Sequence, residues 1–377
     1  MEWIEFLYEN VATNFDIRML IMWVIGGILI YLAIKKDMEP TLLLPIGFGA
    51  ILVNLPLSGV ITRGANEGAL TVLYEAGIAN ELFPLLLFIG IGAMIDFGPL
   101  LSQPVMFLFG AAAQFGIFFA ICLATLLGFD LRDAASIGII GAADGPTSIL
   151  VSQILHSRYV GAIAVAAYSY MALVPIIQPF AIRLVTTKKE RCIRMQYNSK
   201  AVTRKTRILF PIITTIIVGL ISPASVALVG FLMFGNLVRE CGVLDSLSDT
   251  AQHSLANIIT LMLGITVASQ MRSEDFLNIR TLLILLLGLI AFIFDTVGGV
   301  LFAKLLNLFL PKNKKVNPMI GACGISAFPM SARVITQMGI KEDPSNVLIM
   351  QATGVNVSGQ IASVIAGGLI LSLVPLA

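Results

Sequence analysis

A Gly-Pro pair preceded by an acid interrupts a long apolar stretch, and this feature restricts the fold more than any other. The sequence GAADGPTS occupies residues 141–148, inside an apolar run from 134 to 155. Proline lacks a backbone N–H and its ring clashes with the preceding turn, so a regular helix does not continue through it. In a bilayer, broken helices survive only where protein buries them or where they line a cavity. The stretch therefore predicts a broken membrane helix whose ends face an ion or a substrate.

The remainder of the chain also indicates a membrane protein. Hydrophobic residues make up 57% of the 377 residues and charged residues only 12%, whereas soluble domains carry about 25% charged residues. We predict an all-α, polytopic membrane protein of about 10–12 segments, since the apolar runs approach or reach the length of a spanning helix. The candidate segments are 18–34, 42–55, 82–95, 105–127, 133–155, 160–184, 208–220, 226–238, 258–270, 282–310, 317–338 and 347–373.

Several other classes of protein are excluded or gain no support. The four cysteines are scattered and the two histidines are isolated, so neither a disulfide framework nor a zinc site is expected. A net charge of +2 gives no reason to expect a nucleic-acid partner. Residues 1–16 predict a short amphipathic or surface segment, and its glutamates do not resemble the basic start of a secretory signal.

A strongly basic loop divides the chain. Residues 183–207 contain nine basic side chains and a single acid, Glu190. The positive-inside rule places this loop in the cytoplasm. It is either a solvated linker or a surface that holds an anionic partner.

The two sides of this loop resemble each other. Gly, Pro and Ser recur at equal spacing in residues 141–148 and in GISAFPMS at 324–331. We therefore predict two inverted repeats, each with a broken helix. Inversion requires an odd number of crossings per half, so one of the six segments in each half is re-entrant, fused or unpaired. The expected divisions are 1–185 with its break at 141–148, the basic loop 186–206, and 207–377 with its break at 317–333.

Asp144 is the first candidate for chemistry. A carboxylate at the bilayer midplane costs roughly 2.5–3.5 kcal/mol on insertion scales, so it must be protonated, paired or bound to a cation. Burial favours the protonated form and a bound cation favours the ionised form. One group can thus exchange Na⁺ for H⁺. The alternative is a neutral structural acid bonded to Thr147 or Ser148.

Further polar groups lie in apolar segments. Asp295 is either a second functional acid or a cap on a neighbouring broken helix. The second break has no acid, but Asn317, Ser326 and the carbonyls near Gly321 offer the oxygen ligands that Na⁺ prefers. Arg333 requires either an acid such as Asp144 or an anionic substrate.

Two groups of polar residues follow the breaks. Tyr168 and Tyr170 lie beyond the first break. Residues 356, 360 and 363 nearly share one helix face beyond the second break, since they are spaced at i, i+4 and i+7.

Three motifs in this order resemble a known family. FIGIGAMIDFGPLL at 88–101, GAADGPT at 141–147 and SAFPMSAR at 326–333 are similar to the β subunits of sodium-pumping, biotin-dependent decarboxylases, which act on oxaloacetate, methylmalonyl-CoA or glutaconyl-CoA. The resemblance covers nearly the whole chain. It implies a bacterial inner-membrane subunit that decarboxylates carboxybiotin, takes up a proton and exports Na⁺.

The resemblance also implies partners and site residues. The expected partners are a carboxyltransferase α subunit, a biotin carrier protein that supplies carboxybiotin, a small γ or δ membrane subunit and further copies of the chain. The family's essential acid and tyrosine map onto Asp144 and Tyr170, and Arg333 with Ser358 would contact carboxybiotin. The residues expected to bind Na⁺ are Asp144, Asn317, Gly321, Ser326 and Asn356.

Two other functions remain open on the sequence. A stand-alone transporter that couples Na⁺ to an organic anion would use similar broken helices and would need no biotinylated partner. An ion channel or membrane anchor would not need Asp144 to exchange a proton.

Overall fold

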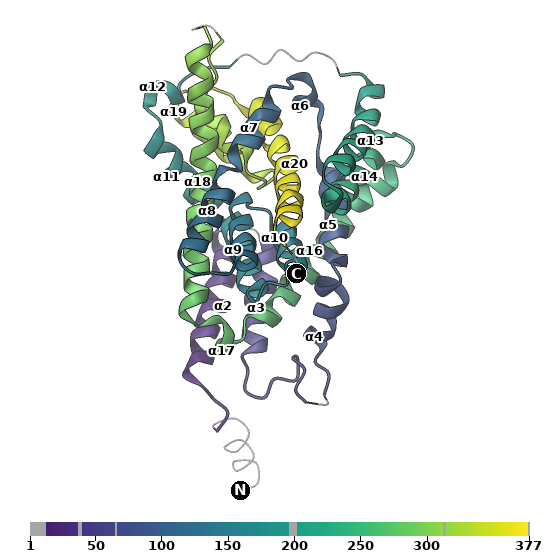
Figure 1. Cartoon of the computed structure of the whole chain (residues 1–377), viewed down its shortest axis with the longest axis vertical. Coiled ribbons are helices and arrows are strands. Elements are labelled where there is room, and N and C mark those ends of the chain that lie inside the picture. Colours follow the sequence, from purple (N-terminus) through teal and green to yellow (C-terminus); the bar gives the residue numbers. More distant parts are fainter. Residues whose placement is uncertain (1–12, 37–39, 65, 196–201, 312–313, 376–377) are drawn as a thin grey trace.

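A computed structural model describes residues 13–36, 40–64, 66–195, 202–311 and 314–375, and these residues form helices without a β-sheet. Most of the surface segment expected at 1–16 lies outside the described residues. The molecule is elongated, with the short helix α12 (Lys188–Arg191) of the basic loop at one end (Figure 1). Helices α4 (Ala69–Tyr74) and α17 (Ser273–Phe276) lie at the opposite end (Figure 1).

The helices confirm an all-α, multi-pass membrane protein. Five are long and apolar enough to span a bilayer, and up to seven spans result when two bent pairs are counted. The five are Ile17–Lys36, Met106–Leu126, Asp245–Gln270, Ile279–Phe309 and Ile349–Leu373. The two bent pairs are Ala69–Ala79 with Leu82–Met94, and Val160–Met171 with Leu173–Val185.

Shorter helices complete the described chain. Segments predicted at 42–55, 208–220 and 226–238 form α3 (Pro40–Val53), α13 (Arg204–Ile221) and α14 (Val226–Glu240). The named elements within or beside the longer spans are α2 (Ile17–Lys36), η2 (Glu75–Ala79), α5 (Leu82–Met94), α6 (Gly98–Ser102), α7 (Met106–Ala113), α8 (Phe115–Leu126), α11 (Val160–Val185), η4 (Pro223–Ser225), α15 (Asp245–Thr250), η5 (Ala251–Leu255), α16 (Ala256–Val267), η6 (Ala268–Gln270), α18 (Ile279–Phe309) and α20 (Ile349–Leu373).

The first interruption has a simple local cause. Helix α9 (Leu131–Gly138) tightens into the 3₁₀ turn η3 (Ile139–Ala142), and α10 (Gly145–Ile154) then starts in a new direction. Ala143 is left-handed with φ 52°, and Asp144 is extended and caps α10. Pro146 falls in the first turn of α10, where its missing N–H costs no helical hydrogen bond.

The second interruption faces the first. The 3₁₀ helix η8 (Pro318–Gly324) ends in an extended link, and α19 (Met330–Glu342) follows it. In the link, the Ser326 N–H donates to the carbonyl of Ala142, at an N···O distance of 2.9 Å. Residues from the two halves of the chain therefore meet at the points where both helices are broken.

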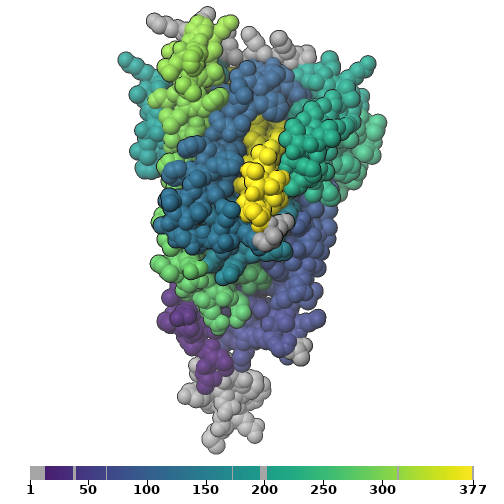
Figure 2. Space-filling model, in the orientation of Figure 1, coloured from purple at the N-terminus to yellow at the C-terminus, as the bar shows by residue number. Residues whose placement is uncertain are grey.

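Two long helices support the interruptions. Helix α18 packs on η8 so closely that a Cβ added at Gly321 would lie 2.0 Å from the carbonyl oxygen of Gly299. A Cβ at Gly359 of α20 would lie 2.3 Å from the carbonyl oxygen of Gly324. Figure 2 shows α20 between the α6–α8 region and the α13–α14 pair. The second interruption thus lies between two helices that approach it backbone to backbone.

Candidate ion-binding site

Asp144 lies at the meeting point of the two interruptions, where only 3% of its surface is exposed. Its Oδ2 accepts hydrogen bonds from the Thr147 hydroxyl at 2.7 Å and the Ser326 hydroxyl at 3.2 Å. It also accepts from the Gln360 amide at 3.2 Å and the Ser363 hydroxyl at 3.1 Å. Three parts of the chain, α10, the second link and α20, therefore converge on one carboxylate oxygen.

This donor set is suited to a small cation or a proton. None of the ion pairs in the described part of the chain involves Asp144. A buried carboxylate without a charged partner is costly. Hydroxyls rotate to present oxygen instead of hydrogen, and an amide can turn its oxygen inward. The same four side chains can therefore stabilise the carboxylate or, with it, coordinate Na⁺, which is a hard ion.

A cavity of about 210 Å³ lies beside Asp144. Residues from α3, α5, α10, α11, α16 and α20 and from the second link line it, including Thr260, Ser326, Gln360 and Tyr168. The Tyr168 ring lies against Gly145, and its buried hydroxyl has no hydrogen-bond partner among the described residues. A polar group without a partner thus lines the same cavity as the carboxylate.

The structure places Tyr170 elsewhere. Its hydroxyl donates to the carbonyl of Leu285 on α18, and its ring packs near Gly288 in a separate buried cluster. The residues that line the cavity beside Asp144 include Tyr168 and not Tyr170.

The structure does not bring Asn317 to Asp144. The Asn317 amide nitrogen donates to the carbonyls of Arg191 and Ile193, both at 2.8 Å. Its Oδ1 accepts from the N–H of Met319 at 3.0 Å and so caps η8. In this conformation Asn317 joins the described part of the basic loop to the second interruption.

Gly321 lies within the second interruption, in η8, and Asn356 contacts that interruption from α20. Gly321 is in the close contact with α18 described above. The Asn356 amide nitrogen donates to the carbonyls of Ile325 at 2.8 Å and Cys323 at 3.2 Å, and its buried oxygen has no partner among the described residues. Asn356 therefore supports the backbone that carries Ser326, rather than contacting Asp144.

The residues expected to contact carboxybiotin are not adjacent. Ser358 donates to the carbonyl of Val355 and lies against Gly110 of α7. Arg333 is exposed on α19, and its side chain forms no ion pair with any described residue. Of the two possibilities for Arg333, a pair with Asp144 is not formed in this conformation, and contact with an anionic substrate stays a prediction.

Ion pairs hold the described part of the basic loop to the chain itself. Nitrogen–oxygen distances are 2.7 Å for Arg191–Glu342, 2.7 Å for Arg194–Asp343 and 3.1 Å for Lys304–Glu190. The hydrogen bond from Arg194 lowers the pKa of Asp343, which favours its charged form at neutral pH. These pairs favour a linker that packs against the second half of the chain.

The predicted Na⁺ site omits three of the four side chains that contact Asp144, namely Thr147, Gln360 and Ser363. The sequence places Gln360 and Ser363 only near one face of the last helix. That spacing was the available signal, because a polar face on a buried membrane helix needs a polar partner. The sequence indicates Thr147 only as a partner of a structural acid.

Asp295 accepts a hydrogen bond from the first turn of α8, within the Met106–Leu126 span, and so has a structural contact of the kind that one of its two predicted roles requires. Its Oδ1 accepts from the N–H of Ile117, in the first turn of α8, at 3.1 Å. Its Oδ2 is buried against Gly141 of η3 and has no partner among the described residues. The carboxyl group thus connects α18, α8 and the first interruption.

We expect Asp295→Leu to destabilise the protein more than Asp295→Asn. Leucine leaves the Ile117 N–H buried without an acceptor, at a cost of about 1–3 kcal/mol, whereas asparagine retains an acceptor oxygen. The thermal unfolding of the purified variants measures the difference. Equal unfolding temperatures for Asp295→Asn and Asp295→Leu would contradict the structural role. Loss of Na⁺ transport in an Asp295→Asn variant as stable as wild type would show that Asp295 has a functional role as well.

These features define a class of protein. An all-helical membrane chain with a buried acid between two interrupted helices has the architecture of an ion-translocating membrane protein. The sequence model described as the Na⁺-transporting oxaloacetate decarboxylase beta subunit matches residues 18–374. The chain belongs to this family of decarboxylase beta subunits, which also includes its methylmalonyl-CoA and glutaconyl-CoA relatives.

Curated relatives match over nearly their whole length. The methylmalonyl-CoA decarboxylase subunit beta of Veillonella parvula is 50% identical over 353 residues, which cover 94% of this chain and 92% of the relative. The glutaconyl-CoA decarboxylase subunit beta of Acidaminococcus fermentans is 49% identical with the same coverage. Oxaloacetate decarboxylase beta chain 2 of Salmonella typhi is 43% identical, with 94% of each chain covered. The resemblance noted in the three motifs is confirmed.

Proposed function

We propose that this chain decarboxylates carboxybiotin, consumes a proton in that reaction and couples it to Na⁺ export. In the reaction the bond between the biotin ring nitrogen and the carboxyl carbon breaks, CO₂ leaves, and the proton takes its place on the nitrogen. The observation that carries the proposal is the convergence of four polar side chains on Asp144 where the two interruptions meet.

Asp144 has two alternative occupants in this proposal. When Na⁺ is bound, the carboxylate neutralises it and the surrounding oxygen atoms complete the coordination. When Na⁺ leaves, the buried carboxyl group takes up a proton, because an unpaired charge there is costly. Thr147, Ser326, Gln360 and Ser363 hold the group in both forms. Competition between Na⁺ and H⁺ at one oxygen would couple transport to proton consumption.

The predicted roles of the other site residues remain proposals. Arg333, exposed and without an ion pair among the described residues, would receive the carboxylate of carboxybiotin. Asn317, Gly321 and Asn356 fix the backbone of the second interruption in this conformation. They would enter the Na⁺ site only after that segment moves. Tyr170 and Ser358 would likewise need to move to act on the substrate.

The beta-subunit family supports a multi-subunit assembly. We propose that the chain works in a bacterial inner membrane with a carboxyltransferase α subunit, a biotin carrier protein, a small γ or δ membrane subunit and further copies of itself. The basic loop faces the cytoplasm, where the carrier would bring carboxybiotin. The two halves, 1–185 and 207–377, are proposed to be inverted repeats that move relative to each other.

A reconstituted complex tests the function. Proteoliposomes should take up radiolabelled ²²Na⁺ when a carboxylated substrate is supplied, and avidin, which sequesters biotin, should stop both the uptake and CO₂ release. Na⁺ uptake that continues with the chain alone and an organic-anion gradient, with no biotinylated partner, would favour the stand-alone transporter instead. CO₂ release that is independent of Na⁺ would contradict the coupling.

A further inference from the structure

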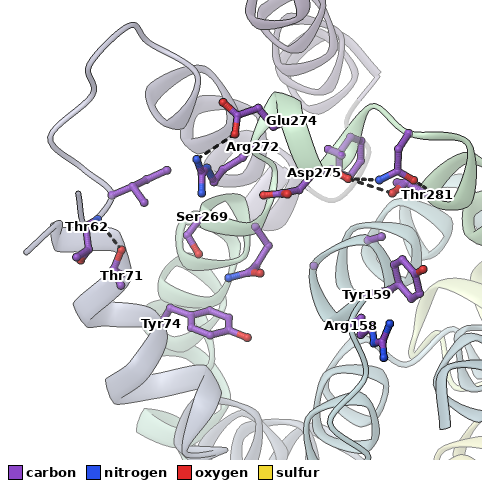
Figure 3. Close-up of a pocket in the computed structure, with 16 residues that line it drawn as sticks. Thr62, Thr71, Tyr74, Arg158, Tyr159, Ser269, Arg272, Glu274, Asp275 and Thr281 are labelled. Atoms are coloured by element: carbon purple, nitrogen blue, oxygen red, sulfur yellow. Dashed lines mark hydrogen bonds and ion pairs between the residues drawn. The ribbon is translucent and has the colours of Figure 1, made fainter. Parts of the chain in front are cut away.

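A second cavity lies at the end opposite the basic loop (Figure 1). It has a volume of about 510 Å³. Its walls are the connection before α4, α4 itself, the start of α11 and the corner from η6 through α17 to α18. Figure 3 shows polar side chains around it, with Thr71 and Tyr74 on one side and Tyr159 on another. We call this cavity the polar vestibule.

The polar vestibule can accommodate a hydrated cation. Glu274 is held by Arg272 at 3.3 Å, whereas Asp275 forms no ion pair with a described residue. The buried hydroxyl of Ser269 also lines the cavity and has no partner among the described residues. An open polar cavity with an unpaired hydroxyl and a free carboxylate suits an ion that keeps its water.

The polar vestibule and the cavity beside Asp144 have walls from the same helices. On α11, Gly161 lines the vestibule and Tyr168 lines the Asp144 cavity. On the α16–η6 span, Gln270 lines the vestibule and Thr260 lines the Asp144 cavity. Helix α10 also connects the two cavities. Its N-cap is Asp144, and near its other end Gln153 donates to the hydroxyl of Tyr74, which lines the vestibule, at 2.9 Å.

Between the residues that line or contact the two cavities, α10, α11 and α16 carry apolar side chains that belong to a single buried cluster. We call them the apolar layer, which consists of Ile149, Ala164, Val165, Leu263 and Val267. At the floor of the vestibule α11 and η6 touch, since a Cβ added at Gly161 would lie 2.1 Å from Cβ of Gln270.

We propose that the polar vestibule is the outer mouth of the ion pathway and that the apolar layer is its closed outer gate. The proposal rests on the proposed function and on a cytoplasmic basic loop. Na⁺ released from Asp144 leaves through the vestibule when α11 and α16 separate, and the proton arrives by the same route. An apolar seal excludes ions because a charge without its water is costly in a low-dielectric layer.

Chemical modification from the outer side tests this inference. Right-side-out membrane vesicles carrying Thr71→Cys or Gln270→Cys are treated with a membrane-impermeant, cationic methanethiosulfonate reagent. The protein is then reconstituted and its ²²Na⁺ uptake measured. We expect a loss of at least tenfold at either position, because the attached cation obstructs and repels Na⁺. Glu67→Cys is the matched control, since Glu67 is exposed in the connection before α4 but does not line the vestibule.

A second measurement examines the gate without depending on transport. Thr260 and Gln270 are similarly half-buried but lie on opposite sides of the apolar layer. We expect Thr260→Cys to react from the outer side at least tenfold more slowly than Gln270→Cys. Equal reaction rates, or complete labelling at Thr71→Cys and Gln270→Cys with unchanged Na⁺ uptake, would overturn the inference. Wild-type protein treated in the same way corrects for the four native cysteines.

The two proposals fail in different ways. If Asp144→Asn retained Na⁺ uptake, the proposed function would be wrong whatever the vestibule does. If Asp144→Asn abolished uptake while labelled vestibule variants transported normally, the function would stand and only the outer mouth would be misplaced.

Discussion

Replacement of Asp144 by asparagine should abolish both carboxybiotin decarboxylation and Na⁺ uptake. Asparagine keeps the size of the side chain and an acceptor oxygen for Thr147 and Ser363, so the fold is expected to survive. It removes the negative charge that neutralises Na⁺ and the carboxyl group that carries the proton. We expect both rates to fall by about 10²-fold or more, the range typical of a lost proton-transfer group.

Parallel assays of CO₂ release and ²²Na⁺ uptake on the purified complex check this result. Asp249→Asn, the same chemical change at an exposed position, should leave both rates near wild type. Ser363→Ala removes only one contact to the carboxylate, so it should weaken the apparent affinity for Na⁺ without abolishing transport. Survival of either activity in a folded Asp144→Asn variant would separate the two processes and refute their coupling.

Addition of a single methyl group at Gly321 should disrupt the second interruption. A Cβ at this position would lie 2.0 Å from the carbonyl oxygen of Gly299, and a Cβ at Gly299 would lie 2.1 Å from the carbonyl oxygen of Gly321. Backbone atoms cannot rotate away, so either alanine forces η8 from α18. We expect Gly321→Ala and Gly299→Ala each to cost about 1–3 kcal/mol or more, and each to inactivate the complex.

The paired design distinguishes packing from ligation. If Gly321 acted only through its carbonyl as a Na⁺ ligand, Gly299→Ala would be harmless and Gly321→Ala would alter only the apparent Na⁺ affinity. Thermal unfolding and ²²Na⁺ uptake of both variants separate these cases. Gly230→Ala on α14 is the control, because its Cβ would meet only one atom, at 3.9 Å. Unchanged unfolding temperatures in both test variants would contradict the close contact.

Local chemistry in the sequence predicted the elements but not all of their contacts. The Gly-Pro pair predicted where α10 would start, and high hydrophobicity predicted the membrane class. The first conclusion depends on the backbone geometry of proline, and the second depends on the free energy of transfer of apolar side chains from water to the bilayer. Both are properties of residues that are close together in the sequence. The periodic spacing of Gln360 and Ser363 indicated a polar face, but periodicity does not identify the group that the face meets.

The neighbourhood of Asp144 was harder to predict. Ser326 lies 182 positions from Asp144 and Ser363 lies 219 positions away. Their approach depends on how α18 and α20 hold the second interruption. Asn317 has suitable oxygen chemistry for Na⁺, but in this conformation its side chain bonds to the basic loop and to η8. Side-chain chemistry alone does not show which of several competing partners is within reach.

The sequence by itself determined a helical membrane protein with a broken helix and a buried acid at residue 144. These features follow locally, because backbone groups in a bilayer need hydrogen-bond partners and a buried charge is costly. Only the tertiary structure decided that Ser326, Gln360 and Ser363 surround that acid and that Tyr168, rather than Tyr170, lines the cavity beside it. The physical reason is that contacts between distant segments follow from helix packing, which depends on close backbone-to-backbone approaches such as that of Gly299 and Gly321.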